Sequence, residues 1–145
     1  MKKLLLLAVL SLCVTLALCL AQKKGVGSAK SDVDIDLSRY SITMAQAELY
    51  NMMMEPERYE GKKVRLHGAF DVFEYEEHGA VHQSYACIIQ DATACCAQGM
   101  EFVLASGSYP DDYPRIGEEC TVTGRYHVEE ADGLSYIRLV DSELL

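Results

Sequence analysis

The apolar residues of this chain follow three successive patterns. Residues 4–20 carry no charge and are nearly all apolar, and lysines flank the run on both sides. Apolar residues then recur near helical spacing between residues 41 and 54, and residues 63–140 contain several segments in which apolar and polar side chains alternate. The patterns predict an apolar leader, one helix and a set of strands.

The helix is expected to run from Ser41 or Thr43 to about Met54. Either hydroxyl can accept a hydrogen bond from the free backbone N–H groups of the first turn. Pro56 lacks a backbone N–H and ends the helix. The apolar face is predicted to consist of Ala45, Leu49, Met52 and Met53.

Five strands are predicted in the remainder of the chain. Gly68 lies in the middle of the first, where a bend or a bulge is the usual reason for a glycine. Asp132-Gly133 is typical of a tight hairpin between the last two. A long first strand bent at a glycine favours a mostly β fold, namely a small five-stranded OB-fold-like barrel preceded by one short α-helix; a small β-sandwich is the alternative. The predicted strands cover residues 63–72, 82–90, 100–104, 120–128 and 136–140.

Residues 1–21 are predicted to be a secretory signal peptide, because a lysine-rich start precedes the apolar run and a small residue, Ala21, ends it. Processing as a lipoprotein at Cys19 is a second alternative, and an uncleaved membrane anchor is a third. The signal segment engages the membrane during export. Residues 22–40 are expected to form a flexible tether and residues 41–145 the barrel domain, secreted or tethered outside the cytoplasm.

The part that follows the signal peptide is strongly acidic. The whole chain has 13 Lys and Arg against 22 Asp and Glu, with a formal net charge of −9. Because Lys2 and Lys3 are the charged residues of the leader, the remainder is more acidic still. Such a surface repels phosphate backbones, so nucleic acid is not an expected partner. The expected partner is another envelope or membrane protein.

Four cysteines remain after the leader, and three kinds of chemistry are open to them. An oxidising compartment favours disulfides, and all four are candidates. A metal site would use Cys95, Cys96 and Cys87 and hold zinc or copper, although their spacing matches no standard zinc motif. Free thiols are the third alternative, and no cofactor is the leading expectation. Cys87 and Cys120 would join two strands if those strands lie close together.

Three motifs between residues 44 and 141 together resemble a family of exported OB-fold-like proteins of Firmicutes with a Cys-Cys motif. They are also similar to the extracytoplasmic portion of two-component permease subunits of those bacteria. The resemblance implies a fold and a location, and it implies no activity. The motifs are Tyr59-x-Gly61-Lys62-x-Val64-x-Leu66-x-Gly68, Cys87-Ile88-Ile89-x-Asp91-x-x-x-Cys95-Cys96 and Gly117-x-x-x-x-Val122-x-Gly124.

The sequence contains no Gly-x-Ser-x-Gly, no glycine-rich phosphate loop and no His-Glu-x-x-His. An enzyme is therefore not expected. The predicted function is that of an exported, non-enzymatic OB-like binding domain of the cell envelope. The alternative is a metal-binding or thiol-redox protein that uses the Cys95–Cys96 pair. Tyrosines near the second strand and the loop before the fourth are candidates for a ligand face: Tyr75, Tyr85, Tyr109 and Tyr113.

Overall fold

The computed structural model describes residues 32–90, 97–131 and 133–145. The predicted signal peptide, most of the predicted tether and the Cys95–Cys96 pair lie outside these residues. Within them, no helix is long and apolar enough to cross a membrane. The elements are β1 (Ile35–Asp36), η1 (Leu37–Arg39), α2 (Ile42–Met54), η2 (Pro56–Arg58), β2 (Lys63–Glu77), β3 (Ala80–Gln90), β4 (Ala97–Leu104), β5 (Glu119–Ala131) and β6 (Leu134–Leu144).

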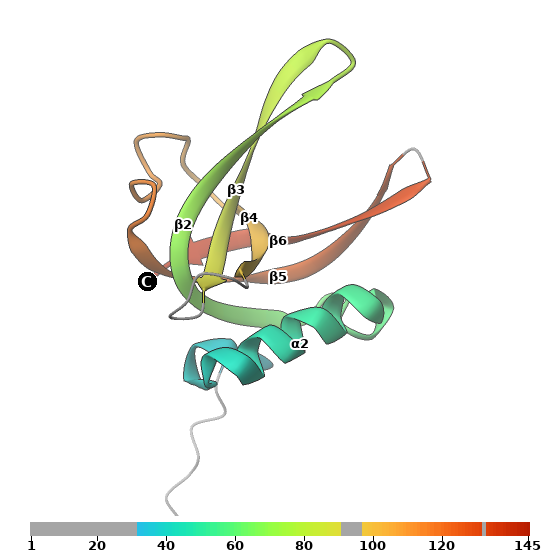
Figure 1. The fold of residues 1–145 in the computed structure, drawn as a ribbon, viewed down its shortest axis with the longest axis vertical. Helices are drawn as coiled ribbons and strands as arrows, with labels where there is room; N and C mark the ends of the chain where they lie inside the picture. Colours follow the sequence, from blue (N-terminus) through green and yellow to red (C-terminus); the bar gives the residue numbers. More distant parts are fainter. Residues whose placement is uncertain (1–31, 91–96, 132) are drawn as a thin grey trace, which may run out of the picture. The chain divides into compact units, whose positions relative to one another are not determined.

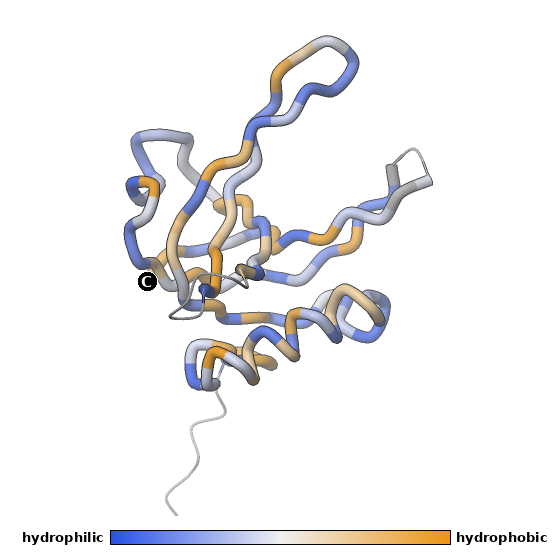
Figure 2. Tube along the Cα trace, viewed as in Figure 1, coloured by the Kyte–Doolittle hydropathy of each residue, from blue (hydrophilic) through white to orange (hydrophobic). Residues whose placement is uncertain are grey.

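Strands β2 to β6 form a ring, which confirms the predicted OB-fold-like barrel. The sheet order is β1-β2-β3-β4-β6-β5, and a further pairing of β2 with β5 closes the circle. Helix α2 precedes the five strands in the chain and packs against β3 and β4 (Figure 1). Along the strands, hydrophobic and hydrophilic residues follow one another in short stretches (Figure 2). The inward-facing residues meet in one core.

Strand β2 takes part in both halves of the ring because it bends at Gly68. Its first part, up to Ala69, pairs with β5, and its second part, from Ala69 onward, pairs with β3. A Cβ atom at position 68 would lie only 2.3 Å from the carbonyl oxygen of Ile88. Only glycine fits this close approach between the backbones of β2 and β3. Of the two alternatives, a bend or a bulge, the change of pairing partner at Ala69 favours the bend.

Helix α2 begins and ends where the sequence indicates. Ser41 is the N-cap, and its hydroxyl accepts a hydrogen bond from the backbone N–H of Met44 at 3.3 Å. Ala45, Leu49 and Met52 are buried against the barrel. Met53 is 48% exposed, so its predicted place on the buried face is wrong.

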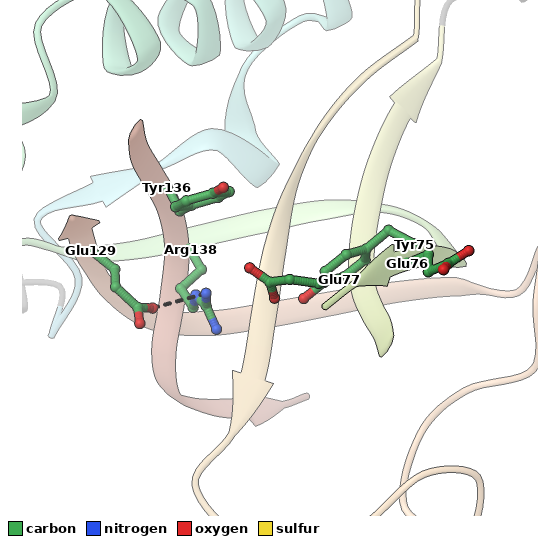
Figure 3. Close-up of a pocket in the computed structure, with 6 residues that line it drawn as sticks. All are labelled: Tyr75, Glu76, Glu77, Glu129, Tyr136 and Arg138. Carbon is green, nitrogen blue, oxygen red and sulfur yellow. Dashed lines mark ion pairs between the residues drawn. The ribbon is translucent and has the colours of Figure 1, made fainter. Parts of the chain in front are cut away.

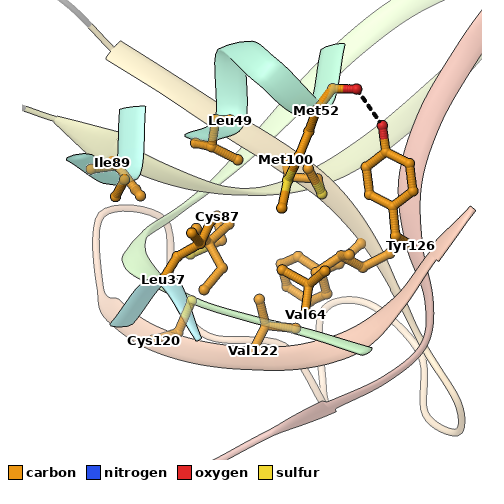
Figure 4. Packing of buried hydrophobic residues seen from close by; sticks show 14 of the residues in the cluster. Leu37, Leu49, Met52, Val64, Cys87, Ile89, Met100, Cys120, Val122 and Tyr126 are labelled. Atoms are coloured by element: carbon orange, nitrogen blue, oxygen red, sulfur yellow. Dashed lines mark hydrogen bonds between the residues drawn. The ribbon is translucent and has the colours of Figure 1, made fainter. Parts of the chain in front are cut away.

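The last turn of α2 is completed by a side chain of the barrel. In a regular helix, the Met52 carbonyl would accept a hydrogen bond from the backbone N–H of residue 56, but residue 56 is a proline. The hydroxyl of Tyr126 on β5 donates to this carbonyl instead, at 2.7 Å (Figure 4). The ring of Tyr126 is fully buried. The pair therefore links the helix end to the barrel wall.

Replacing Tyr126 by phenylalanine should lower the free energy of unfolding by about 1 to 3 kcal/mol, because the Met52 carbonyl is left buried without a donor. Urea unfolding followed by circular dichroism measures the change. Tyr50→Phe is the matched control, since Tyr50 is 53% exposed on the same helix, and it should change the unfolding free energy by less than about 0.5 kcal/mol.

Titration of Tyr126 gives the same contact a pH dependence. Burial first, and then the nearby Glu60 carboxylate, raise the pKa of Tyr126 to about 12. An unfolded tyrosine ionises near pH 10, so the stabilisation is complete below about pH 10 and is lost as the pH rises towards the folded pKa. The Tyr126→Phe variant should lack this part of the alkaline loss. An unchanged alkaline transition in the variant would contradict the assignment.

Residues 32–40, expected to belong to the tether, are part of the compact unit, which begins at Asp32. Strand β1 pairs in parallel with the start of β2, and Val33 and Leu37 are buried. Val33, Ile35 and Leu37 alternate with Asp34 and Asp36, which is the pattern of a short edge strand. The predicted domain boundary at residue 41 is therefore nine residues later than the boundary of the fold.

Candidate functional site

Two hairpins extend beyond the ring, and we call them the first arm (residues 72–85) and the second arm (residues 128–137). In the first arm β2 and β3 pair only with each other, because β5 leaves β2 at Ala69 and β4 pairs with β3 only from Ala86. In the second arm β5 pairs with β6 alone, because the pairing of β4 with β6 starts at Arg138. Both arms project from the barrel in Figure 1.

A cleft of about 360 Å³ lies between the arms (Figure 3). Residues from both arms line it, together with Arg138 at the base of the second arm. Carboxylates outnumber cations among these residues by three to one, and two aromatic rings accompany them. The lining residues are Tyr75, Glu76, Glu77, Glu129, Tyr136 and Arg138.

Aromatic rings are exposed on both sides of the cleft. Tyr75 is 47% exposed and stacks on His82, with the ring centroids 5.6 Å apart. Tyr136 is 43% exposed and lies opposite Glu129 in the register of β5 and β6. A half-exposed ring retains a free face to which a ligand can bind.

The charges of the cleft are unequally compensated. Arg138 forms an ion pair with Glu129, with 2.8 Å between Nη2 and Oε2. The Nε atom of Arg138 is buried and has no hydrogen-bond partner among the described residues. Glu76 and Glu77 form no ion pair with any residue that the structure describes. The first arm therefore presents two uncompensated carboxylates to the cleft.

A second hollow, of about 420 Å³, adjoins the cleft on the side of α2. It forms because β4 and β6 pair only from Glu101 and Arg138 onward, so the preceding parts of the two strands diverge. Tyr136 lines both hollows. The half-exposed Met53 of α2 lines the far wall. Together the two hollows provide an elongated surface from the first arm to the helix.

The tyrosines predicted to form a ligand face divide into two groups. Tyr85, Tyr109 and Tyr113 come together, with ring centroids 4.5 to 6.0 Å apart. They are half-buried and pack against Phe70, so they extend the core beneath the loop that joins β4 to β5. Their role as a ligand face stays a prediction. Tyr75 lies apart from them, in the cleft between the arms.

The predicted cysteine sites are described in part. Cys87 and Cys120 are buried free thiols in the core. Cys95 and Cys96 lie outside the described residues, so a zinc or copper site built on them stays a prediction, as do disulfides that involve them. Residues 32–90, 97–131 and 133–145 contain no group of three His, Cys, Asp or Glu side chains placed to hold a metal ion.

Sequence reasoning missed most of the residues that line the cleft. Glu129 directly follows the predicted strand 120–128 and belongs to none of the motifs, and Tyr136 and Arg138 are only residues of the predicted strand 136–140. The Asp132-Gly133 motif predicts only that Glu129 and Tyr136 lie near a hairpin turn. Their position opposite Tyr75 depends on the pairing of strands that are distant in the sequence.

The ring of strands, the preceding helix and the cleft between two hairpins define an OB-fold-like domain. No protein-family model and no curated protein matches the chain. A solved structure from Klebsiella pneumoniae subsp. pneumoniae MGH 78578, described as a "putative nucleic acid-binding lipoprotein", is similar to it with a TM-score of 0.43 and 18% sequence identity. The match covers 67% of this chain and 84% of that one.

Proposed function

We propose that this chain is an exported, non-enzymatic OB-like binding domain of the cell envelope, and that its ligand occupies the cleft between the two arms. The observation that carries the proposal is this cleft, with its two half-exposed tyrosines and its uncompensated carboxylates. The apolar leader of residues 1–21 supports the extracytoplasmic location.

The position of the cleft supports its use for binding. Ligands of OB-folds lie across the second and third strands of the barrel, between the loops that join strands one to two and four to five. In this ring the second and third strands are β3 and β4, and the corresponding loops are the turns of the two arms. The cleft is therefore at the place where the architecture offers a concave surface.

The chemistry of the lining favours a basic segment of a partner protein. Glu76 and Glu77 can each accept hydrogen bonds from a lysine or arginine side chain, which makes a charge-assisted contact. The exposed rings of Tyr75 and Tyr136 attract the same cations through their faces. A phosphate backbone would instead be repelled by the acidic first arm, so we do not propose nucleic acid as the ligand.

A fluorescein-labelled octalysine peptide provides a direct test. The Glu76→Gln/Glu77→Gln double variant should bind it at least tenfold more weakly than the unaltered protein, as measured by fluorescence anisotropy at low ionic strength. The reason is that each lost carboxylate removes a charge-assisted hydrogen bond, and two such bonds exceed the roughly 1.4 kcal/mol that corresponds to tenfold.

Glu57→Gln/Asp111→Asn is the matched control, because both residues are exposed, lie outside the cleft and remove the same charge. It should lower the affinity less than threefold. Equal losses in the two variants would show that octalysine binds to the net charge alone. Tight binding of single-stranded DNA would contradict the proposed ligand class.

A further inference from the structure

Cys87 and Cys120 lie in one buried cluster although they belong to strands that are not neighbours in the sheet order. Cys87 on β3 is fully buried, and Cys120 on β5 is 8% exposed. Strand β2 lies between them: Cys87 pairs with Phe70, and Cys120 pairs with Gly68. Residues 68 and 70 face the same side of β2, so both thiols point into the barrel.

The bend at Gly68 brings these two thiols together. Strands β3 and β5 come into direct contact although β2 lies between them. A Cβ atom on Gly68 would lie 3.3 Å from Sγ of Cys87, and Cys120 is the direct partner of Gly68 across the β2–β5 pairing. The space left by the missing side chain of Gly68 therefore lies next to the sulfur of Cys87, and Cys120 lies directly across from it on β5. Figure 4 shows both side chains directed into the same cluster beside Leu37.

The electrostatics of the pair report the same proximity. The interaction with the Cys120 thiol, and then burial, raise the pKa of Cys87. The interaction with Cys87 lowers the pKa of Cys120, against the effects of burial and of Glu119. Each thiol is thus the principal influence on the ionisation of the other. Cys120 is the better candidate for the attacking thiolate, because it is the more exposed of the two and its pKa is the lower.

We propose that Cys87 and Cys120, which are unlinked thiols in this structure, are oxidised in the exported protein to a disulfide that joins β3 to β5 across the bend of β2. The inference is independent of the cleft and its ligand, and it uses only the exported location. A bond here would close a loop of 32 intervening residues that contains β4. Closing such a loop restricts the unfolded chain and so stabilises the fold.

The oxidant that the reaction requires is a second disulfide, either that of an envelope thiol oxidoreductase or oxidised glutathione. The Cys120 thiolate attacks one sulfur of the oxidant, which forms a mixed disulfide and releases one thiol. The Cys87 thiolate then attacks the Cys120 sulfur and releases the second thiol. The two cysteines lose two protons and two electrons, and both electrons reduce the oxidant. Cys120, which is 8% exposed, meets the oxidant first, and the fully buried Cys87 then reacts only with the neighbouring Cys120 sulfur.

The test is to express the full chain in an export-competent bacterial host, to quench thiol exchange with acid, and then to block free thiols with N-ethylmaleimide in denaturant near neutral pH, where the thiolate reacts. Digestion without reductant and mass spectrometry then identify linked peptides. We expect a peptide pair that joins Cys87 to Cys120, two hydrogen masses below the reduced pair. A Cys95→Ala/Cys96→Ala variant should retain this pair, and a chain that lacks residues 2–21 and stays in the cytoplasm should carry both cysteines alkylated.

Stability provides a second readout. The urea midpoint of the exported protein should fall on reduction, and this fall should be absent in Cys120→Ala. Alkylation of both Cys87 and Cys120 in the exported protein, or their linkage to Cys95 or Cys96, would overturn the inference. So would copper or zinc retained at one equivalent in native mass spectrometry and lost in Cys120→Ala. Should export itself fail, refolding of the full chain in a glutathione redox buffer decides the pairing separately.

Discussion

Replacing Phe70 by alanine is expected to lower the free energy of unfolding by about 3 to 5 kcal/mol. The ring is fully buried and contacts four other aromatic rings at centroid distances of 5.8 to 6.5 Å. Two of these rings, Tyr109 and Tyr113, belong to the loop that joins β4 to β5. The substitution therefore leaves a cavity in the barrel and removes the support of this loop. Urea unfolding measures the loss, and near-ultraviolet circular dichroism of the folded variant reports the tyrosine environment.

Phe73 provides the control for this change. It lies three residues further along β2, is 47% exposed and pairs with Ser84 on the outward face of the first arm. Phe73→Ala should lower the unfolding free energy by less than about 1 kcal/mol and leave the tyrosine signal unchanged. Similar losses in the two variants would mean that Phe70 is not the centre of the aromatic core.

A methyl group at Gly68 should cost about 3 kcal/mol of stability, near the upper end of what overpacking usually costs. The added Cβ would lie 2.3 Å from the carbonyl oxygen and 2.8 Å from the carbonyl carbon of Ile88. Both are backbone atoms of β3, so relief requires β2 and β3 to separate at the bend. Thermal and urea unfolding of Gly68→Ala measure this cost.

Gly79→Ala separates this clash from the general cost of replacing a glycine. Gly79 has a φ of 78° in the turn of the first arm, and a Cβ there would meet no atom within 4 Å. Its substitution should cost only the roughly 1 to 2 kcal/mol of a left-handed backbone. An equal effect of both substitutions would show that β2 and β3 can separate freely at Gly68, which would contradict the tight bend.

The ring could be predicted because its strands alternate between buried and exposed residues. Val64, Leu66, Gly68 and Phe70 face the core in turn, and the intervening residues face outward. The arms could not be delimited in this way. Residues 73–76 of the first arm are all exposed, so no apolar face marks where the strand ends, and β2 continues to Glu77 although the predicted strand ends at residue 72.

The candidate site was less accessible to sequence reasoning than the barrel. Tyr85 lies more than twenty residues before Tyr109 and Tyr113, and the three rings come together, but the predicted ligand face also includes Tyr75, which lies apart from them. Their half-buried packing could not be inferred, because an aromatic residue suits a core and a ligand face equally. The pairing of Arg138 with Glu129, in contrast, requires the register of β5 and β6.

The hydrogen bond from the Tyr126 hydroxyl to the Met52 carbonyl has a consequence for the order in which the domain assembles. The two residues are 74 positions apart, and the tyrosine completes a helix that precedes the whole ring in the chain. As the chain leaves the ribosome or the translocon with its N-terminus first, the segment of α2 emerges long before its final hydrogen-bond partner. Until β5 follows, the Met52 carbonyl lacks its hydrogen-bond donor and the end of the helix frays. Folding of this domain is therefore coupled to near-completion of the chain, and a stalled or truncated product that lacks β5 leaves its first helix unfinished and open to proteolysis.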